Sequence, residues 1–158
     1  MTRNTKELLD FYHTLDDQMK RVPASTNPCG DCNRCCNGFY LFLTAVEYEV
    51  LVQHLEQKGI EVPVRFQRAS IREIDRPEDP GIVCPFYRKK TGCLAYEVRP
   101  LPCRLYGYYT RRGTVHFEGC VYREPVPYES VEELPFWKEY VKVLTRCPAP
   151  SGFILPDY

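Results

Sequence analysis

Nine cysteines are the residues of this chain most suited to chemistry, and four of them fall within eight consecutive positions. These four are Cys29, Cys32, Cys35 and Cys36. Two cysteines separated by two residues can aim both sulfurs at one metal, and such turns serve zinc sites and iron–sulfur sites alike. Gly30 and Gly38 would let the loop wrap closely around a metal. The run therefore predicts a metal site built from thiolates.

A second group of cysteines is spread over the later part of the chain. Its members are Cys84, Cys93, Cys103 and Cys120. Three ligands at the spacing of the first run are typical of bacterial ferredoxin clusters, where a distant cysteine completes the set. We therefore expect the second group to complete the site begun by the first. Cys147 is interpreted as a free or structural cysteine, although Pro148 follows it as a proline follows the distant ligand in ferredoxins.

The setting of these cysteines favours metal over disulfides. Their number is odd, and the N-terminus lacks the apolar core and cleavage site of a signal peptide. Cytosolic thiols are normally kept reduced. No run approaches the roughly 18 apolar residues that a membrane span needs. We expect a cytoplasmic protein.

The overall charge argues against some classes of partner but identifies none. Lysine plus arginine and aspartate plus glutamate number 21 each, so the formal charge is zero. This balance gives no electrostatic case for nucleic acid or an anionic membrane as the main partner. A protein partner of unknown identity is the remaining expectation.

Three arginines stand next to the cysteines in sequence: Arg34, Arg99 and Arg104. Four thiolates at −1 around Zn²⁺ leave a net charge of −2, and a four-cysteine [4Fe–4S]²⁺ cluster carries the same charge. Burying that charge without compensation is costly. Guanidinium donors to the sulfurs would stabilise the site, so these arginines are predicted to support the cofactor; the alternative is ordinary surface charge.

Two helices are predicted in the first third of the chain. Apolar residues recur at helical spacing over residues 4–21, where Asn4 and Glu7 suggest a capping arrangement. Residues 22–43 are predicted to be the loop that carries the first cysteines. A second helix begins at the capping box Thr44-Ala-Val-Glu47 and ends at Gly59.

The later elements are predicted to be shorter. Residues 60–81 indicate a charged linker, and residues 82–123 are extended and rich in turns. Tyr106–Thr110 and Thr114–Phe117 flank a glycine-containing loop typical of a β-hairpin. A last helix is predicted over 135–146, followed by an irregular tail.

These elements and the 14 prolines define the expected fold. We expect one α+β domain over residues 1–158: small, irregular and stapled by metal, with about three helices, a short β-hairpin and long proline-rich loops. The cysteine motifs occupy roughly residues 25–123.

The motif combination resembles the YkgJ-type cysteine-cluster family, described as zinc- or iron-chelating. The family pattern C-x-x-C-x-x-C-C, then C-P-F, then G-C-x-x-Y-x-x-R-P-x-x-C-R, is filled at every position by CGDCNRCC and by CPFYRKKTGCLAYEVRPLPCR. The resemblance covers roughly residues 25–110 and implies metal binding. The flagellin lysine methylases are similar to this family in their cysteine-rich part, but this chain is short for an additional methyltransferase domain.

Three functions stay open from the sequence. One is an iron–sulfur protein, such as a [4Fe–4S] carrier, that transfers electrons or supports a partner enzyme. Another is a zinc-binding structural or interaction module, and the third is a metal-dependent modifying enzyme related to the flagellin lysine methylases. The adjacent pair Cys35 and Cys36 favours the first, because neighbouring side chains are expected to diverge too far to share one ion. No Ser-His-Asp pattern, phosphate loop or dinucleotide fingerprint is present.

Overall fold

The computed structural model describes residues 2–21, 34–37, 43–62, 66–69, 84–112, 125–146 and 153–156. Within these ranges it is a small α+β domain of helices and short sheets, which confirms the predicted fold class. No helix in the described ranges is long and apolar enough to cross a membrane.

The first helix, α1, spans Arg3–Met19 and confirms the predicted N-terminal helix. The predicted cap at Asn4 is wrong: Thr2 is the N-cap, and its hydroxyl accepts a hydrogen bond from the backbone N–H of Thr5 at 3.3 Å. Asn4 therefore lies inside the helix. The Glu7 carboxylate, which the prediction assigned to the cap, instead pairs with Arg3 Nε at 3.0 Å.

The second helix, α2, spans Ala45–Gln57 and begins with the predicted capping box. Thr44 Oγ1 accepts from the Glu47 backbone N–H, and Glu47 Oε2 accepts from the Thr44 N–H at 2.8 Å. The helix ends at Gln57 with Lys58 as its C-cap, and the predicted terminating glycine, Gly59, follows directly with a φ of +66° that suits glycine. The Ile60 N–H donates to the Leu55 carbonyl at 2.9 Å, which closes the last turn.

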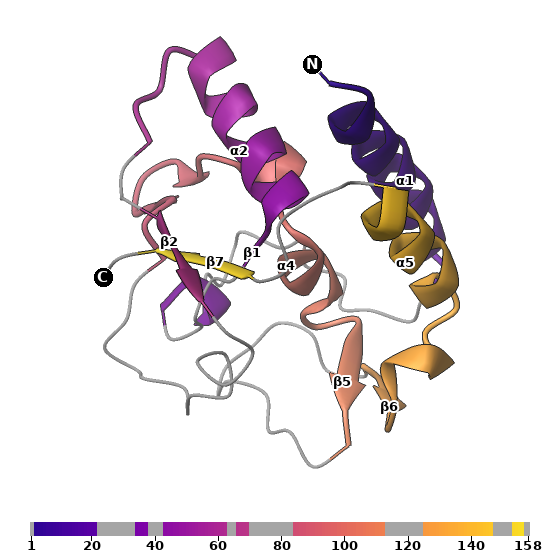
Figure 1. Ribbon diagram of the computed structural model, residues 1–158. Coiled ribbons are helices and arrows are strands. Elements are labelled where there is room, and N and C mark those ends of the chain that lie inside the picture. The colour runs from indigo at the N-terminus through magenta and orange to yellow at the C-terminus, as the bar shows by residue number, and fades with distance from the viewer. Residues whose placement is uncertain are drawn as a thin grey trace.

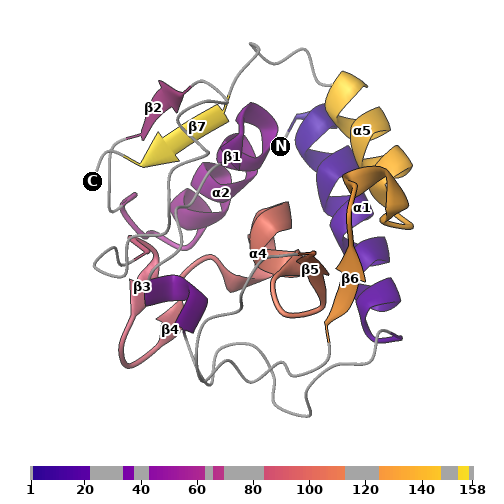
Figure 2. The same ribbon diagram turned by 90° about the horizontal axis from the view of Figure 1, so that it is seen from below.

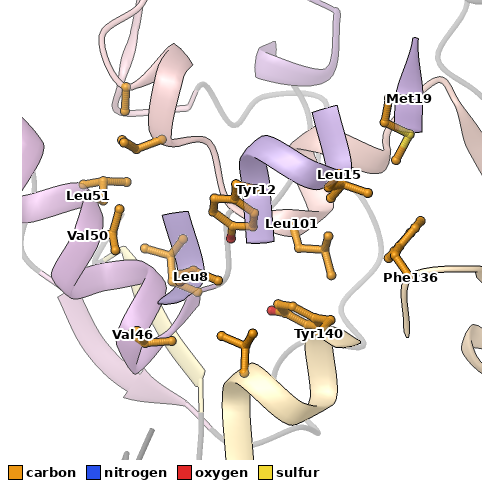
Figure 3. Close-up of a cluster of buried hydrophobic side chains, with 14 of the residues drawn as sticks. Leu8, Tyr12, Leu15, Met19, Val46, Val50, Leu51, Leu101, Phe136 and Tyr140 are labelled. Carbon is orange, nitrogen blue, oxygen red and sulfur yellow. The ribbon is translucent and has the colours of Figure 1, made fainter. Parts of the chain in front are cut away.

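The core lies where α1 and α2 meet two later helices, α4 (Leu101–Leu105) and α5 (Trp137–Arg146). Helix α5 confirms the predicted last helix and lies beside α1 in both ribbon views (Figures 1 and 2). Figure 3 shows side chains from all four helices meeting in this core. The labelled members are Leu8, Tyr12, Leu15, Met19, Val46, Val50, Leu51, Leu101, Phe136 and Tyr140.

A three-stranded antiparallel sheet corrects two predictions. Its order is β1 (Leu43–Thr44), β7 (Phe153–Pro156) and β2 (Phe66–Ala69), so β7 from the tail is the central strand. The tail was predicted to be irregular and residues 60–81 to be a linker. Both predictions are wrong at these strands, because the strands are short and pair with segments far away in sequence, which leaves little local pattern to detect.

A pair of short strands follows α4. Strand β5 (Tyr109–Arg111) runs parallel to β6 (Val126–Tyr128), and the Val126 N–H donates to the Tyr108 carbonyl at 2.8 Å. The predicted hairpin partner of this strand, residues 114–117, lies outside the described residues. Helix α4 occupies a stretch that was predicted to be extended, and the 3₁₀ turn η3 (Val131–Glu133) leads into α5.

One buried carboxylate joins all four helices. Glu47 is only 3% exposed, and its Oε1 accepts hydrogen bonds from Tyr12 Oη at 2.5 Å, the Leu101 backbone N–H at 2.8 Å and Tyr140 Oη at 3.3 Å. These donors come from α1, α4 and α5. Burial, followed by the charge of Glu47, raises the pKa of Tyr12 well above its usual value, so this phenol stays protonated and donates.

We predict that Glu47→Gln lowers the free energy of unfolding by about 2–4 kcal/mol, because the amide NH₂ must face buried N–H or O–H donors and leave them unpaired. Chemical denaturation measures the change. The matched control is Glu56→Gln on the exposed side of α2, expected within about 0.5 kcal/mol of the unmodified chain. Equal stability of the two variants would contradict the role of Glu47.

Candidate metal centre

A short hairpin brings two of the predicted ligands together. Strand β3 (Tyr87–Arg88) pairs antiparallel with β4 (Gly92–Cys93), so Cys93 lies opposite Tyr87. The turn closes through Gly92, whose φ is +76°. The Tyr87 N–H donates to the Cys84 carbonyl at 3.0 Å, so Cys84 lies in the turn that leads into β3, at the open end of the hairpin. The fully buried Phe86 ties the hairpin to the core.

The backbone around Cys84 is arranged to stabilise a thiolate. Burial has the largest effect on the pKa of the Cys84 thiol and raises it, while hydrogen bonds from the backbone N–H groups of Phe86 and Tyr87 to the sulfur lower it. Burial outweighs them, and with the neighbouring thiols Cys36 and Cys93 it raises the pKa of Cys84 to about 12. A metal cation that displaces the proton would remove this penalty, because thiolates are the metal-binding form.

The first cysteine run meets this hairpin through the 3₁₀ turn η1 (Arg34–Asn37). The backbone N–H of Cys84 donates to the Cys36 carbonyl at 2.7 Å, and Figure 2 shows η1, in purple, beside the hairpin. A hydrogen bond from Cys35 and the charge of Arg99 lower the pKa of Cys36, to about 7 overall. The side chains of Cys35 and Cys36 thus interact with each other, although neighbouring side chains were expected to diverge.

Helix α4 contributes the remaining described cysteine, Cys103. Burial of its thiol raises the pKa well above 9, and the next contributions in the same direction come from Cys84 and Cys93. Cys36 adds a smaller one, while Arg99 opposes them. Four thiols from three separate segments therefore share one electrostatic environment. They are Cys36 from η1, Cys84 and Cys93 from the hairpin, and Cys103 from α4.

The donor set fits a soft metal. All five cysteines in the described part carry thiols rather than disulfides. Thiolates suit zinc and iron–sulfur clusters. Among the described residues, no three His, Cys, Asp or Glu side chains stand at the spacing that one metal ion requires. The described thiols are thus gathered in one region but not closed around an ion. The other predicted ligands, Cys29, Cys32 and Cys120, lie outside the described residues, as does Cys147.

The three arginines that were predicted to support the cofactor differ in their surroundings. Arg104 is buried between α1 and the cysteine segment: its Nη1 lies 2.6 Å from both carboxylate oxygens of Asp16, and Nη2 and Nε donate to the carbonyls of Glu97 and Arg99 at 2.6 and 2.7 Å. Its guanidinium also covers the Tyr12 ring at 4.1 Å. These contacts fix the backbone that precedes Cys103.

Arg99 influences the thiols through its charge. Its charge lowers the pKa of both Cys36 and Cys103. The side chain of Arg34 is not described. The sequence reading did not identify Asp16, the partner of Arg104, and recognised Glu47 only as a helix cap. No local pattern around Asp16 distinguishes it from the other acidic residues of α1.

Comparison with known proteins places the chain in a family. Residues 28–148 match the CxxCxxCC family, described as a "putative zinc- or iron-chelating domain", and the chain belongs to this family. The match confirms the resemblance inferred from the cysteine motifs and supports a metal cofactor of zinc or iron. Neither the curated proteins nor the solved structures gave a match.

We predict that Arg104→Ala lowers the free energy of unfolding by about 3 kcal/mol, because the variant leaves a cavity and two unpaired carbonyls in the core. Arg112→Ala is the control: it removes a mostly exposed pair with Glu129 at 2.8 Å and should cost less than about 1 kcal/mol. Urea unfolding compares the two. A loss of the same size in both variants would show that Arg104 does not anchor the cysteine segment.

Proposed function

We propose that the chain holds an iron–sulfur cluster through its cysteine thiolates and uses it for electron transfer or to support a partner enzyme. The observation that carries this proposal is the gathering of Cys36, Cys84, Cys93 and Cys103 from three segments, with Cys35 hydrogen-bonded to Cys36. Five thiols in one region exceed the four ligands that a structural zinc ion takes. The surplus favours a larger cluster, or more than one metal.

The chain's own residues would perform two tasks for such a cluster. The thiolates Cys36, Cys84, Cys93 and Cys103 would hold it, and the N–H groups of Phe86 and Tyr87 would donate to one of the ligand sulfurs. Hydrogen bonds to cluster sulfurs and partial burial tune the reduction potential. The bound cluster would supply one-electron transfer. A protein that exchanges single electrons needs a partner, so we propose a protein partner in the cytoplasm.

Zinc is the second candidate, and one observation favours it. Cys35 is hydrogen-bonded to Cys36, and two adjacent thiols that interact with each other can both serve one ion. A zinc ion would then staple η1, the hairpin and α4, and its binding energy would add to folding stability. The N–H donors at Cys84 serve a zinc thiolate equally well.

We predict that the full chain purified without oxygen is brown and contains iron together with acid-labile sulfide. Metal analysis, sulfide assay and visible spectroscopy measure this directly. Single substitutions to serine at Cys36, Cys84, Cys93 and Cys103 are expected to reduce bound iron by at least about half, because each removes a thiolate ligand.

Cys147→Ser is the matched control and should retain the iron of the unmodified chain. Colourless anaerobic protein with stoichiometric zinc and no sulfide would overturn the cluster and establish the zinc alternative. Full iron in all four serine variants would overturn the ligand assignment itself.

A further inference from the structure

The turn between β3 and β4 carries a run of positive charge on the surface of the molecule. Arg88, Lys89 and Lys90 are consecutive, and all three are exposed. The Thr91 N–H donates to the Arg88 carbonyl at 3.2 Å, which closes the turn. No acidic residue occurs in the hairpin segment, residues 84–93. The hairpin therefore holds positive charge that it does not itself compensate.

The two lysines at the tip of this turn lack the acidic partners that other lysines have. Lys20, Lys58 and Lys142 each pair with a carboxylate, at 2.6, 3.0 and 2.6 Å. Neither Lys89 nor Lys90 forms an ion pair with any residue of the described ranges. Since these two charges are adjacent and unmatched, they can attract negative charge from outside the chain.

Arg88 has a different task from the two lysines that follow it. Its Nη1 donates to the carbonyls of Pro85 and Tyr87, at 2.8 and 2.9 Å. Both acceptors belong to the strand side of the same hairpin, so the guanidinium is held against its own backbone. Lys89 and Lys90 are therefore the cations of this turn that a partner would meet.

The same hairpin carries two of the proposed ligands. Cys84 lies at its open end, and Cys93 lies in β4, opposite Tyr87. Lys90 precedes Cys93 by three residues. At the rise of a strand, about 3.3 Å per residue, the tip lies roughly 10 Å along the chain from Cys93. A protein bound at the tip thus comes close to the thiol centre, which favours electron exchange because its rate falls steeply with distance.

We propose that Lys89 and Lys90 form the docking point of an acidic protein that exchanges single electrons with the thiol centre. The inference rests on the proposed iron–sulfur function and names the surface chemistry of its partner. Transient redox complexes bury small interfaces, and complementary charge sets how fast they form. In each encounter one electron leaves the reduced carrier and enters the centre, and no bond forms or breaks.

Binding of an acidic flavodoxin to the full, anaerobically prepared chain tests the docking point. An NMR titration of isotope-labelled flavodoxin measures the dissociation constant whichever metal the chain holds. At low salt, Lys89→Gln together with Lys90→Gln should weaken binding about 3- to 10-fold. Lys89→Arg together with Lys90→Arg should match the unmodified chain, because the charge is retained. At high salt these differences should fall below about twofold, because exposed charges are screened.

The matched control removes the same charge from a distant face. Lys6 on α1 and Lys138 on α5 are exposed, and Figure 2 shows both helices on the opposite side of the molecule from β3 and β4. Lys6→Gln together with Lys138→Gln should bind flavodoxin within about twofold of the unmodified chain. In iron-loaded protein, reduction by flavodoxin hydroquinone should slow in the turn variant and stay unchanged in the control.

The docking point is wrong if flavodoxin does not bind the unmodified chain at low salt, or if the glutamine variant of the turn binds as tightly as the unmodified chain. It is also wrong if the control weakens binding equally, since net charge alone would then matter. Single-stranded RNA that binds the unmodified chain and not the turn variant would assign Lys89 and Lys90 to nucleic acid instead.

Failure of the docking point is distinguishable from failure of the cluster. Zinc without sulfide in anaerobic protein overturns the cluster, and electron exchange with it, whatever the flavodoxin titration gives. Iron and sulfide in a protein whose flavodoxin binding ignores Lys89 and Lys90 overturn the docking point alone.

Discussion

The buried Glu47 carboxylate is the interaction on which the rest of the structure depends. It begins as a helix cap for α2 and then accepts hydrogen bonds from Tyr12, Tyr140 and the backbone of Leu101. A buried carboxylate is costly unless its oxygens are satisfied, so the donors on α1, α4 and α5 must stay in place. The bond to Leu101 matters most for function, because α4 begins there and carries Cys103 two residues later.

The segment that carries Cys103 is thus attached to the core by hydrogen bonds of buried side chains. Arg104 fixes the carbonyls of Glu97 and Arg99 against α1, and Glu47 fixes the start of α4. The hairpin and η1 are joined to each other by the bond from Cys84 to Cys36. Buried thiols that repel one another as thiolates gain most from a cation, so the proposed metal would bind favourably here and would in turn tie the segments together.

The sequence predicted the parts of this arrangement that have local signatures. The Thr44 capping box and the periodic helices were found, and the cysteine motifs identified the family. The three-stranded sheet was missed because β7 is a four-residue strand in a proline-rich tail that pairs with distant segments. The contacts of Arg104 were not predicted either. Arg104 follows Cys103 in sequence, but its side chain points toward Asp16, 88 positions away. Such long-range choices are decided by packing, which no local pattern records.

The central claim is that metal is held by sulfur from several segments at once. X-ray absorption at the metal edge of anaerobically prepared protein tests it most directly, because it identifies the neighbours of the metal. The account predicts a shell of sulfur alone, with iron neighbours if the cluster is present. A shell dominated by nitrogen or oxygen, or a sulfur shell unchanged by Cys84→Ser together with Cys103→Ser, would contradict it.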